Sequence, residues 1–248
     1  MNPEGKAVRE TPDGNFPLTR WTVVRTAGRK SHPDIEVARA EVCTLYRYPV
    51  YAFVRRKGHS PEDAEDLTQG FFAVLLEKNY LGAADHERGR FRTFLLATCE
   101  NYLRNEHARK QTLKRGGDIK FTSLPLEDAE NRYQREPVNE MSPAKLYERS
   151  WALSLLALTL DRLRSEFRKA GKLAHFETFE CFLSGDKHEQ SYAAAAQKLV
   201  ISEGAVRVAV HRFRSRYGEL LRQTIAQTVS DPREIEEELR YLFVVLSR

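Results

Sequence analysis

Residues 191–216, SYAAAAQKLVISEGAVRVAVHRFRSR, decide the fold predicted for this chain. Apolar residues recur at three- and four-residue steps from Tyr192 to Leu199, which predicts a short helix with one apolar face. Ser202 is a predicted N-cap, because a serine oxygen can accept hydrogen bonds from the exposed amides of a new helix. The segment therefore predicts two helices joined by a tight turn.

The second predicted helix has two unlike faces. Its packing face carries Val206, Val210, Phe213 and Tyr217. Its outward face carries Gly204, Arg207, Val208, His211, Arg212 and Ser215. Short helices, a tight turn and a cationic outer face are what a helix-turn-helix needs to enter a major groove. An ordinary helical hairpin with a solvated charged face is the alternative.

The same segment resembles the C-terminal promoter-reading domain of bacterial extracytoplasmic-function (ECF) sigma factors, a subfamily of the sigma-70 family. The matching residues are Ser191-Tyr192, Ala195-Ala196, Leu199, Ile201-Ser202-Glu203-Gly204, Val206 and His211-Arg212. The resemblance implies contact with the minus-35 element of a promoter. The residues expected at that DNA interface are Ser202, Glu203, Gly204, Arg207, Val208, His211, Arg212, Arg214 and Ser215.

Three positions depart from the family pattern. Val200 stands where the family usually turns on glycine, and Val208-Ala209 stand where it usually carries polar residues. The arginines and His211 can contact phosphates or purines, and Val208 can rest on a thymine methyl group. The base preference of the domain therefore stays open.

A second motif begins at Ser60-Pro61-Glu62-Asp63, where a capping serine, a first-turn proline and acidic residues predict the start of a helix. The expected outer acidic patch consists of Glu62, Asp63, Glu65, Asp66 and Gln69. On the residues alone this patch can be solvated surface. The run HSPEDAEDLTQGFFAVLLEK, however, resembles the helix by which ECF sigma factors grip the clamp of RNA polymerase.

A helix predicted from Phe91 to about Lys110 combines arginines with aromatic residues, a combination that single-stranded nucleic-acid binding sites use. Phe91, Phe94 and Tyr102 are alternatively core residues. In the sigma family this helix and the loop before it recognise and open the minus-10 element. The contacts that the resemblance implies are Arg88, Arg90, Arg92, Asn101, Arg104, Asn105 and Arg109.

Composition and patterning divide the chain into five parts. These are a tail with a docking segment (1–32), a domain resembling sigma region 2 (33–112), a linker (113–142), a helix-turn-helix domain resembling sigma region 4 (143–226) and an extension (227–248). Periodicity fades in the linker, and its acidic centre at 124–128 is predicted to be semi-extended. The extension predicts an amphipathic helix, with Ile235, Leu239, Leu242, Phe243 and Leu246 on its apolar stripe. That helix either docks on its own domain or, through its acidic run at 234–238, acts as a latch over a DNA- or polymerase-contacting surface.

Charge, motif content and apolar runs limit the functions that this chain can have. The net charge of +5 over 248 residues permits a polyanionic partner without demanding one. The chain has no phosphate-cradling glycine loop, no metal-ligand spacing and no nucleophile motif, so we expect neither catalysis nor a cofactor or metal. The longest apolar run is too short to cross a bilayer, and the first residues do not resemble a signal peptide, which predicts a cytoplasmic protein without a membrane partner.

The resulting prediction is an all-α protein with two helical domains joined by a flexible linker. The resemblance implies an ECF sigma factor whose partners are core RNA polymerase and promoter DNA. Control by an anti-sigma factor, by phosphorylation or by the terminal helix stays open. A stand-alone helix-turn-helix regulator is the principal alternative, and a protein-binding helical adaptor is the third.

Overall fold

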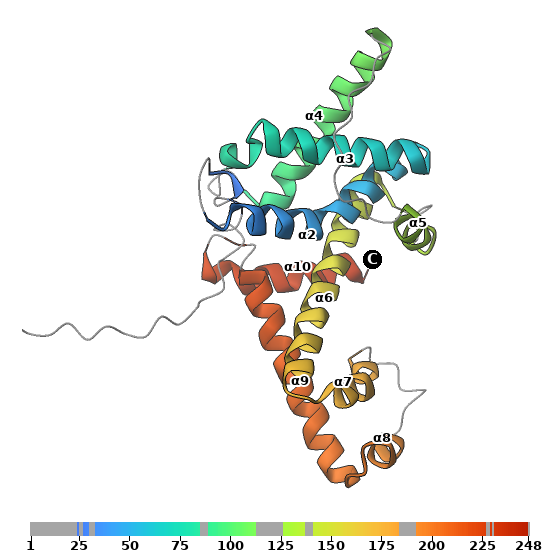
Figure 1. The fold of residues 1–248 in the computed structure, drawn as a ribbon, viewed down its shortest axis with the longest axis vertical. Coiled ribbons are helices and arrows are strands. Elements are labelled where there is room, and N and C mark those ends of the chain that lie inside the picture. The colour runs from blue at the N-terminus through green and yellow to red at the C-terminus, as the bar shows by residue number, and fades with distance from the viewer. Residues whose placement is uncertain are drawn as a thin grey trace, which may run out of the picture.

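All regular elements in the described part of the chain are helices, so the predicted all-α fold class is confirmed (Figure 1). The computed structural model describes residues 24, 27–29, 33–84, 89–112, 126–136, 141–183, 192–226, 229 and 231–247. The α-helices are α2 (Ile35–Arg56), α3 (Pro61–Glu77), α4 (Phe91–Thr112), α5 (Leu126–Gln134), α6 (Pro143–Lys169), α7 (Leu173–Phe179), α8 (Tyr192–Leu199), α9 (Glu203–Ala226) and α10 (Ile235–Leu246). Short 3₁₀ helices are η1 (Tyr80–Ala83), η4 (Glu180–Phe182) and η5 (Pro232–Glu234).

Serine caps start three of these helices where the sequence places them. Ser60 accepts a hydrogen bond from the Asp63 amide at 3.1 Å, and Ser142 accepts one from the Lys145 amide at 3.3 Å. In both helices proline occupies the first position, where the missing N–H would have no partner in any case. Ser202 caps α9 by accepting from the Ala205 amide at 3.2 Å. Local sequence signals therefore fix the starts of α3, α6 and α9.

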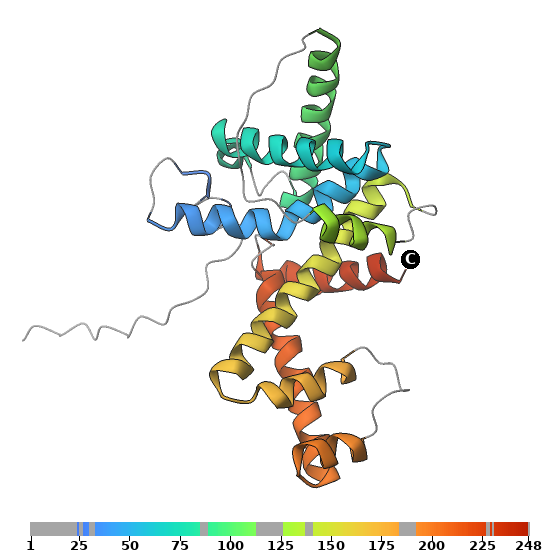
Figure 2. The ribbon, with the colours of Figure 1, turned by 45° about the vertical axis from the view of Figure 1, so that its right-hand side comes forward.

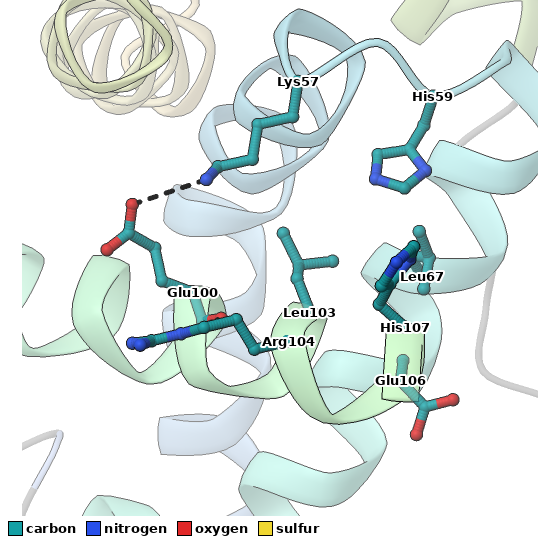
Figure 3. Close-up of a pocket in the computed structure, with 8 residues that line it drawn as sticks. All are labelled: Lys57, His59, Leu67, Glu100, Leu103, Arg104, Glu106 and His107. Atoms are coloured by element: carbon teal, nitrogen blue, oxygen red, sulfur yellow. Dashed lines mark hydrogen bonds and ion pairs between the residues drawn. The ribbon is translucent and has the colours of Figure 1, made fainter. Parts of the chain in front are cut away.

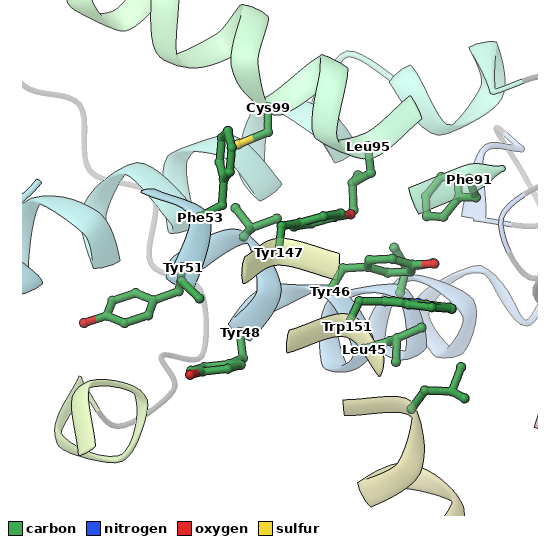
Figure 4. Packing of buried hydrophobic residues seen from close by; sticks show 14 of the residues in the cluster. Leu45, Tyr46, Tyr48, Tyr51, Phe53, Phe91, Leu95, Cys99, Tyr147 and Trp151 are labelled. Carbon is green, nitrogen blue, oxygen red and sulfur yellow. The ribbon is translucent and has the colours of Figure 1, made fainter. Parts of the chain in front are cut away.

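Apolar residues from seven helices form the larger core. It joins α2, α3, α4 and α5 to the first half of α6, the end of α9 and helix α10. Trp151 and Tyr147 of α6 are fully buried, and they lie among Leu45, Tyr46 and Phe53 of α2 (Figure 4). Val24, which belongs to the predicted docking segment, is also buried in this core, whereas residues 16–23 of that segment lie outside the described residues.

A smaller core lies under the predicted helix-turn-helix. Phe213 of α9 packs edge-on against Phe167, Phe176 and Phe179, with ring centroids 5.4 to 5.9 Å apart. Ala195, Val206 and Val210 complete its buried centre. The face predicted for packing in α9 is therefore the buried one.

Helices α6 and α9 connect the two cores. They run side by side from the part of the molecule built on α2 to the end that carries α7 and α8 (Figures 1 and 2). Arg216 of α9 donates two hydrogen bonds to the Glu166 carboxylate of α6, at 2.9 and 2.7 Å. These bonds, with burial as a smaller opposing effect, hold the pKa of Glu166 below its usual range. Both cores thus meet within continuous helices and not at the predicted boundary near residue 143.

The predicted linker contains a packed helix. The semi-extended conformation predicted for 124–128 is wrong from Leu126 onward, where α5 begins. Ala129 and Tyr133 of α5 are buried in the larger core, and Glu130 pairs with Arg55 of α2 at 2.9 Å. Tertiary burial and this ion pair stabilise a helix that is too short to be stable in isolation.

Helix α10 lies across α6 and α9, beside the larger core (Figure 1). Leu239 and Leu242 are buried as predicted, but Phe243 of the same predicted stripe is 64% exposed. One step of 100° around the helix separates Phe243 from Leu242, which is enough to turn its ring out of the interface. None of the described helices has the length and apolar character needed to cross a membrane.

Candidate nucleic-acid interface

The turn between α8 and α9 is short and carries an unusual backbone conformation. Residues 200–202 separate the two helices, as the sequence predicts. Val200 has a φ of +55°, the left-handed region that a β-branched residue rarely adopts, and its side chain is 90% exposed. The conformation explains why glycine would suit this position.

The outward face of α9 is open. Gly204, Val208, His211, Arg212 and Ser215 are all exposed, and Val208 keeps 53% of its surface accessible. Steps of 100° per residue place these positions opposite the buried Val206–Val210–Phe213 side. His211 and Arg212 make no hydrogen bond or ion pair with any other described residue. The centre of this face therefore carries cationic and apolar side chains that are open to solvent.

Two predicted arginines lie at the edges of this face and already have partners. Arg207 pairs with Glu203 at 2.6 Å, and its guanidinium lies 5.1 Å from the centre of the Tyr192 ring. Arg214 donates two hydrogen bonds to the Phe182 carbonyl, at 3.0 and 2.6 Å. These contacts tie α9 to α8 and η4. Ser202, also predicted at the interface, is exposed and serves as the α9 cap.

The second predicted surface lies on α4. Asn101, Arg104, Asn105 and Arg109 are exposed along this helix, whose far end projects beyond α3 (Figures 1 and 2). Arg104 donates to the Asn101 amide oxygen at 2.5 Å, and Arg109 pairs with Glu106 at 3.0 Å. The structure therefore brings these four predicted residues together. Phe91 is buried and Phe94 and Tyr102 pack against the core, in agreement with the alternative that they are core residues.

An open pocket of about 550 Å³ adjoins this surface, between α4, the end of α2 and the start of α3 (Figure 3). Its lining is made by Lys57, His59, Leu67, Glu100, Leu103, Arg104, Glu106 and His107. Lys57 pairs with Glu100 at 3.6 Å across its mouth. The prediction from sequence did not include Lys57, His59 or His107 in the site. Lys57 and His59 lie in the connection between α2 and α3, whereas His107 lies in α4, and only the cationic end of α2 gave a local signal.

Arg90 and Arg92 do not belong to the open surface. Arg92 is only 6% exposed, and both arginines form ion pairs with Glu238 of α10. Both are covered in this conformation, because α10 lies over the start of α4. Arg88 lies outside the described residues.

The acidic patch on α3 is smaller than predicted. Glu62 and Asp66 are exposed and have no ion-pair partner in the described part of the chain, while Asp63 is exposed next to the Ser60 cap. Glu65 is 7% exposed, so its place in the outer patch is wrong. It pairs with Arg47 of α2 at 2.7 Å and accepts a hydrogen bond from Gln69 at 2.8 Å. Glu65 faces α2 because it lies a quarter turn from Asp66.

Potential metal ligands are dispersed, and two of the three cysteines have thiols of low reactivity. Within the described ranges, no group of three or more metal-ligating side chains comes together. Burial raises the pKa of the Cys99 thiol to about 12 and that of Cys43 to about 11, which keeps both thiols protonated at neutral pH. The side chains that dominate the two exposed surfaces are cations and amides, which bind by hydrogen bonding and charge.

Comparisons of the chain with protein-family models, with curated proteins and with solved structures find no match. A function is therefore inferred from the surfaces described above and from the resemblance of the two motifs. The surfaces differ in sign: the open face of α9 is cationic, whereas the exposed carboxylates of α3 are anionic. A chain with both can bind a polyanion and a basic protein surface at the same time.

Proposed function

We propose that this protein is an ECF-type sigma factor, which binds core RNA polymerase and directs it to promoters. The observation that carries the proposal is the presence, in one chain, of exposed carboxylates on α3, those of Glu62 and Asp66, and an open cationic face on α9. Each lies within the motif that resembles the corresponding part of a sigma factor. The proposed activity is recruitment, without covalent chemistry by this chain.

In this proposal α9 enters the major groove of the minus-35 element. Arg212 and His211 supply phosphate or purine contacts, and Val208 rests on a thymine methyl group. The contacts of Arg207 with Tyr192 and of Arg214 with Phe182 support the proposal in another way. They hold the edges of α9 against α8 and η4, so that the helix meets DNA as part of a rigid unit.

The exposed side of α4 would bind the single strand of the opened minus-10 element. Asn101, Arg104 and Asn105 offer amide and guanidinium groups to bases and phosphates. The neighbouring pocket has an apolar floor, formed by Leu67 and Leu103, below the cationic side chain of Lys57. Such a combination suits an unstacked base with its phosphate, because a base needs apolar contact and its backbone needs cations.

The acidic face of α3 would bind a basic surface of the polymerase. Glu62 and Asp66 are one helical turn apart and have no internal counter-ion in the described residues, so their charges are available to a partner. The stand-alone regulator proposed as the alternative would use α9 but would leave this face without a role.

Binding to purified core polymerase tests the proposal. Neutralising the face with Glu62→Gln and Asp66→Asn should weaken the complex by about tenfold at low salt and by less at high salt, because exposed charges are screened. The matched control is Asp161→Asn with Glu177→Gln, two exposed carboxylates on α6 and α7. Equal affinity of the wild type and both double variants would contradict the role of α3. No complex with polymerase at all, together with specific DNA binding, would favour the stand-alone regulator.

A further inference from the structure

A fully buried carboxylate links α10 to the start of α4. Glu238 is 0% exposed and forms ion pairs with both Arg90 and Arg92. Arg92 also reaches the second carboxylate oxygen through its Nη2, at 3.5 Å. Glu237 adds an ion pair with Arg90 at 3.2 Å. The C-terminal helix thus places its acidic side on two arginines that lie more than a hundred residues earlier in the chain.

Aromatic rings enclose this cluster on two sides. The guanidinium of Arg92 lies 4.4 Å from the Trp151 ring and 4.6 Å from the Tyr241 ring. Trp151 belongs to α6 and is part of the larger core, whereas Tyr241 belongs to α10. If α10 moved away, one ring and the carboxylate would leave together. Arg92 would then remain on Trp151 with its other face accessible.

The cluster holds two guanidiniums and two carboxylates, yet one of its buried donors stays unsatisfied. Two guanidiniums offer many N–H donors, and a carboxylate accepts at four lone-pair sites at most. The Nε of Arg92 is buried and has no acceptor among the described residues. Arginine pairs bind phosphate with the same planar donor geometry that they use for carboxylate. A phosphate carries more acceptor sites than a carboxylate does, and a nucleic-acid strand would bring several phosphates.

We propose that Arg90 and Arg92 form a phosphate-binding site for single-stranded nucleic acid, and that Glu238 of α10 occupies this site in the closed protein. The proposal rests on the proposed function, because it extends the single-strand surface of α4 to the beginning of that helix. In the closed form the carboxylate stands where a backbone phosphate would bind. Strand binding at this site requires α10 to leave it.

Several features of α10 suit a helix that can leave the Arg90–Arg92 site. The helix has 12 residues, a length at which an isolated helix is marginal, so its order depends on docking. Of its apolar residues only Leu239 and Leu242 are buried, while Phe243 and Val244 are exposed. The others, Ile235, Tyr241, Val245 and Leu246, are partly buried against the larger core. Its ion pair with α9, between Glu236 and Arg222, is on the surface and is therefore weak.

Full-length Glu238→Gln tests the proposal in a fluorescence-anisotropy titration with a fluorescein-labelled oligothymidylate. Glutamine keeps the size of the side chain but removes the charge that competes with phosphate. We expect binding about tenfold tighter than wild type, because α10 is released from the arginines in a larger fraction of the molecules. The plot of log affinity against log salt should steepen by about 0.7 for each additional phosphate engaged. Glu236→Gln is the matched control, a carboxylate on the same helix that pairs with Arg222, and it should leave both values unchanged.

Hydrogen exchange on the wild-type protein supplies a test that does not depend on a variant. When the oligothymidylate binds, amides of residues 235–246 should exchange faster, while those of 206–220 should not. Unchanged or weaker binding by Glu238→Gln, or protection of α10 in the complex, would overturn the proposal. If Glu238→Gln and wild type bind alike while the polymerase complex forms, only this inference fails. If neither the oligonucleotide nor the polymerase binds, the proposed function fails with it.

Discussion

The two cationic regions of this protein are in opposite states. On α9, the side chains of His211 and Arg212 are exposed and make no hydrogen bond or ion pair with other described residues. On α4, Arg92 is buried between Trp151 and Tyr241 and pairs with Glu238. Both regions lie in helices whose sequences predict nucleic-acid contacts. Only the three-dimensional arrangement distinguishes a surface ready to bind from one that its own chain covers.

This difference has a physical basis in the helices beneath each region. The smaller core buries one side of α9, and no described element covers the other side. The start of α4 lies beside α6 and α10, so its arginines would be buried without a counter-ion if Glu238 were absent. A buried cation without a partner is costly. The acidic side of α10 therefore stabilises the closed region while it hides those arginines.

The largest expected contrast between the regions is in stability. Trp151→Ala, beneath the closed region, should lower the free energy of unfolding by about 3–5 kcal/mol, because it removes a fully buried ring and leaves a cavity. Val208→Ala, on the open face, should change it by less than about 0.5 kcal/mol. Urea denaturation followed by circular dichroism measures both. Similar values for the two variants would show that the closed region is not packed as described.

The open face should account for binding to duplex DNA. Arg212→Ala should weaken binding to a promoter duplex by about fivefold and lower the salt slope by about 0.9, the value for one lost phosphate contact. Arg233→Ala, an exposed arginine that pairs with Asp231 before α10, is the control and should bind like wild type. Anisotropy titrations over a salt series measure both effects. An Arg212→Ala affinity equal to that of wild type at all salt concentrations would remove Arg212 from the interface.

The turn that positions the open face should be improved by glycine. Val200→Gly relieves a left-handed backbone that costs a β-branched residue roughly 1–2 kcal/mol, and it removes a side chain that is almost wholly exposed. Because glycine gains freedom in the unfolded chain, the net gain should be about 1 kcal/mol. Urea denaturation should show the gain, and Val208→Gly, at a helical position of α9, should instead destabilise. Lower stability of Val200→Gly would contradict the backbone conformation described.

The smallest effect is expected at α5, outside both regions. Hydrogen bonds from Arg55, partly offset by burial, lower the pKa of Glu130 from its ordinary value of 4.5. Its folded pKa is below its unfolded pKa, so its stabilising contribution is complete above about pH 4.5 and is lost as pH falls through the folded value. We expect Glu130→Gln to cost less than about 1 kcal/mol at pH 7, and this cost should decrease as pH falls below 4.5. A cost independent of pH would show that charge is not the cause.

Much of the fold could be predicted from local signals. Ser60, Ser142 and Ser202 lie at helix starts, and a clear apolar face identified the buried side of α9. Helix α5 could not be predicted in this way, because contacts of Ala129, Tyr133 and Glu130 with distant helices stabilise it. Leu126, Ala129 and Tyr133 do lie at helical spacing, but nine residues are too few to form a stable helix without those contacts.

The candidate site was also predictable only where it depends on spacing within one helix. The open positions on α9 and on the later turns of α4 follow from helical spacing within one segment. The burial of Glu65 depends on Arg47, and that of Arg92 depends on Glu238, in each case a residue on another helix. Sequence showed an acidic run on the terminal helix, but it did not show which arginines that run would meet.

Run-off transcription with purified core RNA polymerase tests the central claim most directly. The template pool should consist of genomic fragments upstream of genes that overexpression of this protein induces. The proposed function predicts a transcript of defined start that requires both this protein and core polymerase, and that is reduced by Arg212→Ala. Specific binding of the protein to the same fragments without any protein-dependent transcript would contradict it.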